Sequence, residues 1–326
     1  MPEIAYGAGP HRAAILGLGS YVPEHRVTND ALAENLDTSD EWIRQRTGIA
    51  ERRRVATGTT TAELALRAAQ RALTAAEVLP SEIDLIVLGT SSPDQPFPAT
   101  ACHLQRMIGA PGALSFDVLA ACSSWLYATS IAERYISTGA ARRALVVGSE
   151  VMSRLLDYTD RGTCILFGDG AGAAVLGPSD TAGFMGWALG ADGTDSQLIF
   201  YGCTDEDPSD HLRMDGRETF RAASRAMSDA ALRACKVAGV TPADLDLVVP
   251  HQANVRIVEA VARRLGLPME RFVVNLDRYG NTSSASIPIA LEEVVRLGRL
   301  APGDRVLLVG FGAGLTWGAS VVEWGA

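Results

Sequence analysis

The segments "LPSEIDLIVL" (residues 79–88) and "TPADLDLVVP" (residues 241–250) are alike and lie 162 residues apart. A second pair, "ARRALVVGS" (141–149) and "GDRVLLVGF" (303–311), is separated by the same 162 residues. Similar helix–loop–strand patterns are common in α/β proteins, but two matches at one offset favour an internal duplication.

The strand-like parts of these segments, such as "LIVL" and "LVVP", are apolar throughout. Strands that are covered on both faces lack the alternation of polar and apolar residues. Amphipathic helix patterns, such as "TAELALRAAQRALTAAEV" (61–78), lie between them. The sequence therefore predicts an α/β fold of two similar halves, residues 1–180 and 181–326, each with a buried mixed sheet and helices outside it.

The composition is that of a globular protein, with 47% hydrophobic and 21% charged residues in a chain of 326. No apolar run approaches the roughly 18 residues of a membrane span, and the N-terminus lacks the apolar core of a signal peptide. The net charge of -9 disfavours general nucleic-acid binding. Five cysteines without a C-x-x-C pair suggest neither a disulfide framework nor a zinc site. We expect a cytoplasmic protein with no metal, membrane or nucleic-acid partner.

Three residues with chemical potential follow strand-like segments. Cys122 lies between "SFDVL" and a helix-like stretch, His251 follows "LVVP", and Asn281 belongs to "YGNTSSAS". Each alone has an ordinary structural explanation: a buried thiol, a residue at a helix start and a turn. However, the offset of 162 aligns Cys122 with Ser284, close to Asn281. Because α/β folds open their sites at the carboxyl ends of strands, the joint placement favours one functional site.

The three side chains suit acyl transfer. A thiol at a helix N-terminus experiences partial positive charge, which is expected to lower its pKa and favour the reactive thiolate. A thiolate that attacks a thioester yields another thioester, so the acyl group can be passed on. His251 and Asn281 can both donate hydrogen bonds to a developing enolate oxygen.

The sequences "AAC" at Cys122, "PHQAN" at His251 and "GNTSSAS" at Asn281 resemble those of the β-ketoacyl-acyl carrier protein synthase III enzymes of the thiolase superfamily. So do "DEWIRQRTGIAERR" (40–53), "DRGTCILFGDGAGAAVL" (160–176) and the closing "GFGAGLTWGAS". The resemblance implies a thiolase-like homodimer with αβαβα layers and no cofactor. It also implies an acyltransferase that condenses acyl-CoA with malonyl-acyl carrier protein to initiate fatty acid synthesis.

The resemblance also assigns roles to residues. Cys122 would take the acyl group, and His251 and Asn281 would stabilise the enolate that decarboxylation produces. The backbone N–H groups of Cys122 and Ala313 would form the oxyanion hole. Family members usually have glycine where Ala313 stands, and alanine fits there if its φ is negative.

Further matches concern CoA and the carrier protein. Trp42 and Arg161 would sandwich the adenine, with Arg46 and Arg256 near the pantetheine channel and the phosphates. Arg256, Arg263 and Arg264 lie on one helix face, which suits an acidic carrier protein. Solvated charged surface remains the alternative for Arg46 and for this arginine face.

The chain departs from the family pattern after the nucleophile, where Ser124 replaces a glycine and Trp125 follows. We expect Trp125 to shape the acyl pocket, together with Phe97 of the dimer partner. A phenylalanine there would favour short acyl groups, because it fills the volume that a longer chain needs. An alternative function is the priming of polyketide or other specialised-metabolite synthesis, or acyl transfer to another acceptor.

Two other protein classes were considered. Papain-like proteases also have the chain order Cys, His, Asn, and "CSSW" resembles their cysteine motif. The position of Cys122 far from the N-terminus and the duplicated apolar strands argue against that class. A non-catalytic dimerising scaffold is the second rival, and it predicts no acyl adduct on Cys122 after incubation with acyl-CoA.

Overall fold

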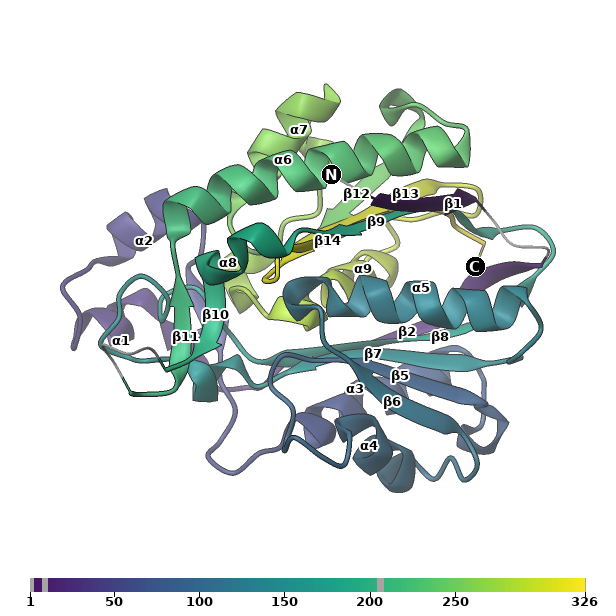
Figure 1. Ribbon diagram of the computed structural model, residues 1–326, viewed down its shortest axis with the longest axis horizontal. Helices are drawn as coiled ribbons and strands as arrows, with labels where there is room; N and C mark the ends of the chain where they lie inside the picture. The colour runs from purple at the N-terminus through teal and green to yellow at the C-terminus, as the bar shows by residue number, and fades with distance from the viewer. Residues whose placement is uncertain (1–2, 8–10, 204–207, 326) are drawn as a thin grey trace.

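The computed structural model describes residues 3–7, 11–203 and 208–325. Two five-stranded sheets stack with helices between and outside them (Figure 1). The first sheet has the order β2 (Arg12–Tyr21), β8 (Gly170–Ser179), β7 (Ala144–Glu150), β5 (Leu85–Gly89) and β6 (Leu114–Val118). The second has the order β1 (Glu3–Gly7), β9 (Gly183–Ala191), β14 (Thr316–Glu323), β13 (Arg305–Gly312) and β12 (Leu247–Pro250). Both are mixed, because each contains parallel and antiparallel pairs.

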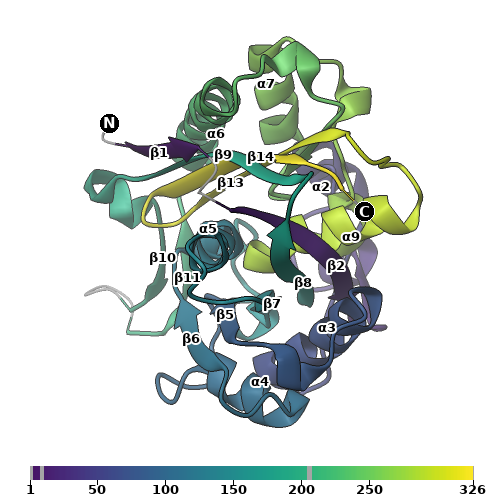
Figure 2. The same ribbon diagram turned by 90° about the vertical axis from the view of Figure 1, so that its right-hand side faces the viewer.

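The helices form three layers around the two sheets, as the side view shows (Figure 2). The central layer consists of α5 (Ser124–Ser137) and α9 (Ser286–Arg296). The outer layers are α3 (Thr61–Ala75) with α4 (Thr100–Ile108), and α6 (Gly216–Ala238) with α7 (Val255–Leu265). The expected αβαβα arrangement is therefore confirmed for the single chain.

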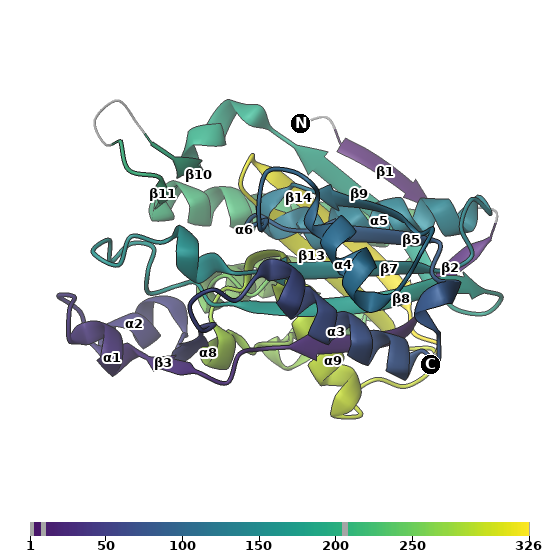
Figure 3. The same ribbon diagram turned by 90° about the horizontal axis from the view of Figure 1, so that it is seen from below.

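Smaller elements extend the fold at one end, where α1, α2, β10 and β11 gather (Figure 3). They are β3 (Arg26–Thr28), α1 (Asn29–Ala33), α2 (Asp40–Thr47), β4 (Glu51–Arg53), β10 (Ile199–Gly202), β11 (His211–Met214) and α8 (Leu276–Tyr279). β3 pairs with β4 and β10 with β11, each in a two-stranded antiparallel sheet. Among them, α2, β10 and β11 contribute residues to the wall of the cavity described below.

Local sequence signals explain several element boundaries. Thr60 and Glu63 form a capping box at the start of α3. Gly239 and Gly266 end α6 and α7 in the left-handed conformation that glycine adopts without strain. β5 and β7 are buried along their whole lengths, as their uninterrupted apolar sequences predict.

The structure contains the duplication that the sequence indicates. β5 begins at Leu85 and β12 at Leu247, which are 162 positions apart. The short 3-10 helices η2 (Ala121–Ser123) and η7 (Ser283–Ala285) have the same separation of 162. The expected division after residue 180 falls between β8 and β9, although β1 of the N-terminal part pairs with β9 of the second sheet. We retain that division as a proposal.

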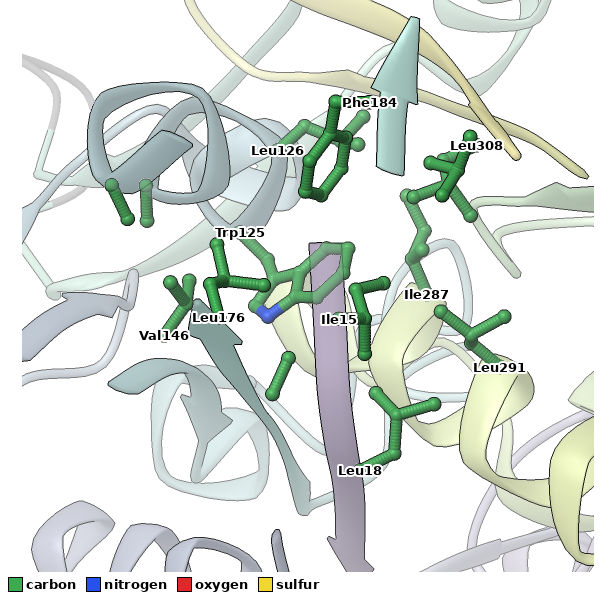
Figure 4. Packing of buried hydrophobic residues seen from close by; sticks show 14 of the residues in the cluster. Ile15, Leu18, Trp125, Leu126, Val146, Leu176, Phe184, Ile287, Leu291 and Leu308 are labelled. Carbon is green, nitrogen blue, oxygen red and sulfur yellow. The ribbon is translucent and has the colours of Figure 1, made fainter. Parts of the chain in front are cut away.

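The space between the sheets is filled by a hydrophobic cluster around Trp125 (Figure 4). Trp125 points from α5 toward β2 and is fully buried. Other members of the cluster are Ile15, Val146, Leu176, Phe184, Ile287 and Leu308. The expectation that Trp125 shapes an acyl pocket is corrected by this placement, because the indole packs into the core and is not part of the cavity wall described below.

Candidate active site

Cys122 lies in the tight turn η2 that leads from β6 into α5. The turn needs an unusual backbone: Ala121, directly before the cysteine, has a φ of 46°, which is uncommon for a residue other than glycine. The end of β13 approaches this turn closely, because a Cβ atom on Gly312 would lie 2.7 Å from the backbone nitrogen of Cys122. Only glycine at position 312 allows the β13 backbone to pack this closely against the turn.

Although Cys122 is partly accessible, its thiol lies deep in the protein, and this desolvation raises its pKa to about 12. The nearby Ser283 hydroxyl lowers the pKa, and a negative charge on Glu150 would raise it. The expected lowering by the helix N-terminus is thus outweighed by burial. The resting group is a neutral thiol.

His251 follows β12 directly, and its backbone N–H donates to Val309 at 2.8 Å. The imidazole is buried, and its Nδ1 lies 2.6 Å from the Ser286 hydroxyl. Burial lowers the His251 pKa to about 3, so the ring is neutral. The Ser286 oxygen also accepts the Gln252 N–H at 3.4 Å. In the tautomer in which the Ser286 hydroxyl donates to Nδ1, the Nε2 atom carries the ring proton and can act as a donor.

Asn281 is held on both sides of its backbone. Its N–H donates to Leu166 at 2.8 Å, and its carbonyl accepts from Gly168 at 3.0 Å. Gly280 precedes it with a φ of 66°, where a Cβ atom would lie 2.7 Å from the Leu166 oxygen. The Oδ1 atom of Asn281 accepts from the Ser283 N–H at 2.8 Å. This bond orients the amide and leaves the Nδ2 group as a hydrogen-bond donor.

Cys122, His251 and Asn281 line one cavity of about 1120 Å³. Ala313 lies on the same wall, and its φ is not among the positive values of the described non-glycine residues, as alanine requires there. The cavity is otherwise mainly apolar, with walls from the β10–β11 hairpin and α6 that include Phe200, Leu212, Met214, Phe220 and Met227.

The four residues expected to bind CoA also line this cavity: Trp42, Arg46, Arg161 and Arg256. The guanidinium group of Arg161 lies 4.7 Å from the centre of the Trp42 ring. A ring inserted between two such planes needs two gaps of about 3.5 Å each. The two side chains therefore stack on each other, and Arg161 would have to move for the expected sandwich to form.

Three other expected site residues lie outside the cavity wall. Phe97 is 83% exposed on the loop before α4. Arg263 and Arg264 lie in the last turn of α7, where Arg264 forms a 2.6 Å ion pair with Asp229 of α6. Arg256, at the start of the same helix, donates to the Gln45 carbonyl at 2.9 Å.

Sequence reasoning missed four residues near the nucleophile: Glu150, Ser283, Ser286 and Gly312. Glu150 ends the apolar strand β7 and is fully buried. The offset of 162 aligns it with Gly312, which is itself next to Cys122. The duplication therefore contained a signal for both residues, whereas nothing in the sequence singled out Ser286.

The described residues offer neither a metal-binding cluster nor a membrane-spanning helix. Among residues 3–7, 11–203 and 208–325, no group of three or more His, Cys, Asp or Glu side chains is arranged to hold a metal ion. Within the same ranges, every helix is too short or too polar to cross a membrane.

Comparison with known proteins places these features in context. Residues 235–324 match the family described as 3-oxoacyl-[acyl-carrier-protein (ACP)] synthase III C terminal. Residues 116–193 match 3-oxoacyl-[acyl-carrier-protein (ACP)] synthase III.

Individual relatives cover nearly the whole chain. A beta-ketoacyl-[acyl-carrier-protein] synthase III of Erythrobacter litoralis is 49% identical over 96% of this chain and 99% of its own. The solved enzyme of that name from Thermus thermophilus is 47% identical, with a TM-score of 0.92 over 96% of this chain and 99% of its own. The priming beta-ketosynthase of the R1128 polyketide pathway is 39% identical, with a TM-score of 0.92 over 98% of each chain.

Proposed function

Because the chain belongs to the 3-oxoacyl-[acyl-carrier-protein] synthase III family, we propose that its large cavity carries out a two-step acyl transfer with Cys122 as the nucleophile. The protein is an acyltransferase that condenses the acyl group of acyl-CoA with malonyl-acyl carrier protein, giving a 3-ketoacyl product in the initiation of fatty acid synthesis. The observation that carries the residue assignment is the convergence of Cys122, His251 and Asn281 on one cavity.

In the first step, the Cys122 sulfur attacks the thioester carbonyl of acyl-CoA. The carbonyl electrons move onto oxygen, which the N–H groups of Cys122 and Ala313 would stabilise. The intermediate collapses, the carbon–sulfur bond to CoA breaks, and the cysteine proton leaves with the CoA thiol. Since the resting thiol has a pKa of about 12, binding of the substrate must accompany its deprotonation.

In the second step, the malonyl group loses carbon dioxide, and the electrons of the broken carbon–carbon bond form an enolate. The Nε2–H of the neutral His251 and the Nδ2–H of Asn281 would donate to the enolate oxygen. The nucleophilic carbon attacks the acyl-cysteine carbonyl and releases the Cys122 thiolate. Side-chain and backbone donors complete both steps, so we propose that no cofactor is required beyond the substrate acyl-CoA.

The arginines support the substrate assignment. Arg46, Arg161 and Arg256 are exposed, whereas His251 and Asn281 are buried, so the cavity leads from a basic rim to the reactive centre. Guanidinium groups bind phosphates through paired hydrogen bonds, which suits CoA. Arg256, Arg263 and Arg264 form an adjoining surface on α7 that suits an acidic carrier protein.

A second copy of the chain would complete the site. β6 is an edge strand of the first sheet, and Leu114 at its start and Leu119 just after it are 50% and 76% exposed. Exposed apolar groups beside an edge strand are typical of an interface. We propose a homodimer in which Phe97 of each chain enters the acyl pocket of its partner. Sedimentation velocity measures the expected dimer mass, and a monomer at micromolar concentration would contradict it.

A reducing compartment suits this chemistry. All five cysteines are free, and the nucleophile must stay a thiol to be acylated. We propose a cytoplasmic location on this basis.

Two-stage mass spectrometry tests the function. Incubation with acetyl-CoA should add an acetyl group to the Cys122 peptide, and subsequent malonyl-acyl carrier protein should remove it and release carbon dioxide. Cys122→Ala should lose both steps. Cys102→Ala, a half-buried thiol on α4, is the matched control and should retain both. Wild-type protein that acquires no acetyl group would overturn the proposal.

A second candidate function is the priming of polyketide synthesis, which the R1128 ketosynthase similarity favours. A panel of acyl-CoA thioesters of increasing length distinguishes the two. Loading restricted to acetyl and other short groups supports the fatty acid function, and preference for a longer or branched starter supports polyketide priming.

A further inference from the structure

Glu150, at the end of β7, is a fully buried carboxyl group that the proposed two-step reaction does not use. The groups within hydrogen-bond distance of its oxygens are hydroxyls and backbone N–H groups. They are the Ser91 N–H at 3.0 Å, the Ser92 hydroxyl at 2.6 Å, the Thr90 hydroxyl at 3.2 Å, and the hydroxyl and N–H of Ser284 at 2.7 and 3.3 Å. These neighbours are all uncharged, so an ionised Glu150 would place a buried negative charge among them without a positive partner.

The internal duplication explains where Glu150 lies. At the offset of 162, Ser284 is the counterpart of Cys122 and Gly312 is the counterpart of Glu150. In the catalytic half, Gly312 has no side chain, and its backbone packs closely against the turn at Cys122. In the other half, the Glu150 carboxyl lies against the Ser284 nitrogen at 3.3 Å. The duplicated turn is thus held by a carboxyl group where the catalytic turn packs against a glycine.

The protons around Ser284 indicate which form of Glu150 is present. The Ser284 hydroxyl lies 2.9 Å from the Gly89 carbonyl oxygen and 2.7 Å from Oε1 of Glu150. It has one proton and cannot donate to both. A protonated Glu150 resolves the conflict, because it donates to the Ser284 oxygen while Ser284 donates to Gly89. Burial acts in the same direction and raises the pKa of Glu150.

The turn that Glu150 holds also holds Asn281. The Ser283 N–H donates to the Asn281 Oδ1 at 2.8 Å, and Ser283 has a φ of 49°, a conformation that requires support from its surroundings. The Ser283 hydroxyl is buried close to both Cys122 and Glu150. Within the described part of the chain, no partner lies in hydrogen-bond geometry to its oxygen. Glu150 therefore holds Ser284 in place. Ser284 directly follows Ser283, whose N–H orients the Asn281 amide.

We propose that Glu150 is a positioning residue that remains protonated and, by tying down the Ser283–Ser284 turn, aims the Asn281 amide at the enolate. This inference rests on the proposed function, since it assigns Glu150 to the condensation step and not to acylation of Cys122. A neutral acid also avoids placing a negative charge beside the nucleophile, where it would oppose thiolate formation.

Glu150→Gln and Glu150→Ala test the proposal together. Glutamine is neutral and carries a donor group beside an acceptor oxygen, as a protonated carboxyl does, so it should keep acylation and condensation within about twofold of wild type. Alanine removes the support of the turn and should slow condensation roughly ten- to a hundredfold, as loss of an orienting neighbour does, while acylation stays within about threefold. Glu133→Gln, a buried carboxyl on α5 away from the cavity, is the matched control and should behave as wild type.

The pH dependence of Cys122 alkylation by iodoacetamide gives an independent readout. Cys122 is the titratable neighbour that responds to the charge of Glu150, and the other groups around Glu150 are the Thr90, Ser92, Ser283 and Ser284 hydroxyls and backbone N–H groups. Glu150→Gln should leave the alkylation profile unchanged. A profile displaced to lower pH would show that the wild-type carboxyl is charged and would overturn the proposal.

Two further outcomes would also overturn it: a condensation loss in Glu150→Gln as large as in Glu150→Ala, or an equal loss of both half-reactions in Glu150→Ala. If Glu150→Ala does not fold, the glutamine variant and the alkylation profile still decide. Wild-type protein without acylation or condensation would instead contradict the proposed function, so the two failures are distinguishable.

Discussion

The Nδ1 atom of His251 lies 2.6 Å from the Oγ atom of Ser286, a residue from the start of the central helix α9. The bond joins the second sheet to the central helix layer and fixes the orientation of the ring. In the proposed condensation step, the Ser286 hydroxyl donates to Nδ1 and the ring proton lies on Nε2. The imidazole can then present Nε2–H to the cavity.

Ser286→Ala should therefore slow condensation roughly ten- to a hundredfold, as expected when the partner that orients a catalytic histidine is lost. Acylation of Cys122 should change little, because the proposed first step does not use His251 as a donor. Single-turnover measurements of the two half-reactions check this. Ser228→Ala, which removes a buried hydroxyl bonded to Ser224 at 2.7 Å in α6, is the matched control. Equal slowing of both half-reactions would contradict the role of Ser286.

Gly312→Ala should slow the acylation of Cys122, the half-reaction that Ser286→Ala leaves nearly unchanged. The added Cβ would lie 2.7 Å from the Cys122 nitrogen and 2.8 Å from the Ala120 oxygen, so the backbone must shift at the proposed oxyanion hole. Loss of one such donor slows catalysis roughly 10²–10³-fold. The rate of acetyl transfer to Cys122 is the measurement. Gly193→Ala, where the new Cβ would meet nothing within 4 Å, should retain the wild-type rate. A Gly312→Ala variant with normal acylation would place the oxyanion hole elsewhere.

Much of this fold could be predicted from the sequence, because the apolar strands and the repeated segments can be recognised directly in the order of the residues. The offset predicted that Cys122 and Asn281 lie close together, the strand-end position of His251 predicted the third residue, and all three line one cavity. The environment of these residues could not be predicted in the same way. The high pKa of the Cys122 thiol depends on desolvation by segments distant in sequence, and it outweighs the helix-terminus effect that the local sequence indicates.

Side-chain direction was the other quantity that the sequence did not determine. Trp125 is three residues after the nucleophile in the sequence, yet its side chain points from α5 into the core and is fully buried there. Arg161 could be assigned to the cavity from its motif, but its stacking on Trp42 depends on how α2 is placed relative to the segment before β8. Such details require the tertiary structure.

The placement of Trp125 predicts that its replacement alters stability and not substrate choice. Trp125→Ala should lower the free energy of unfolding by about 3–5 kcal/mol, as for other buried aromatic residues. Trp125→Phe should cost less, because the indole N–H has no hydrogen-bond partner among the described residues and its removal offsets part of the lost packing.

Urea unfolding of each variant gives the stability, and the acyl-CoA panel gives the substrate preference. Both should be measured on the same Trp125→Phe preparation. A shift of this variant toward longer acyl chains would show that Trp125 contributes to the acyl pocket after all.

The neutral state of His251 predicts a specific loss of stability in acid. Burial lowers its pKa from the usual 6.5 to about 3 in the folded protein. Between these values the unfolded chain binds a proton at this residue and the folded chain does not, so the stabilising contribution is complete above pH 6.5 and is lost as the pH falls through about 3. Since one pKa unit corresponds to about 1.4 kcal/mol, the effect amounts to a few kcal/mol.

His251→Asn removes the titrating group and should make the free energy of unfolding decline less steeply than in wild type between pH 6.5 and pH 3. Urea unfolding at a series of pH values in this range measures the difference. His103→Gln, on α4 outside the cavity, is the control for removal of a histidine and should follow the wild-type curve. Parallel curves for His251→Asn and wild type would show that His251 takes up its proton near the usual pKa of 6.5 in the folded protein, and burial would then not be what keeps the ring neutral.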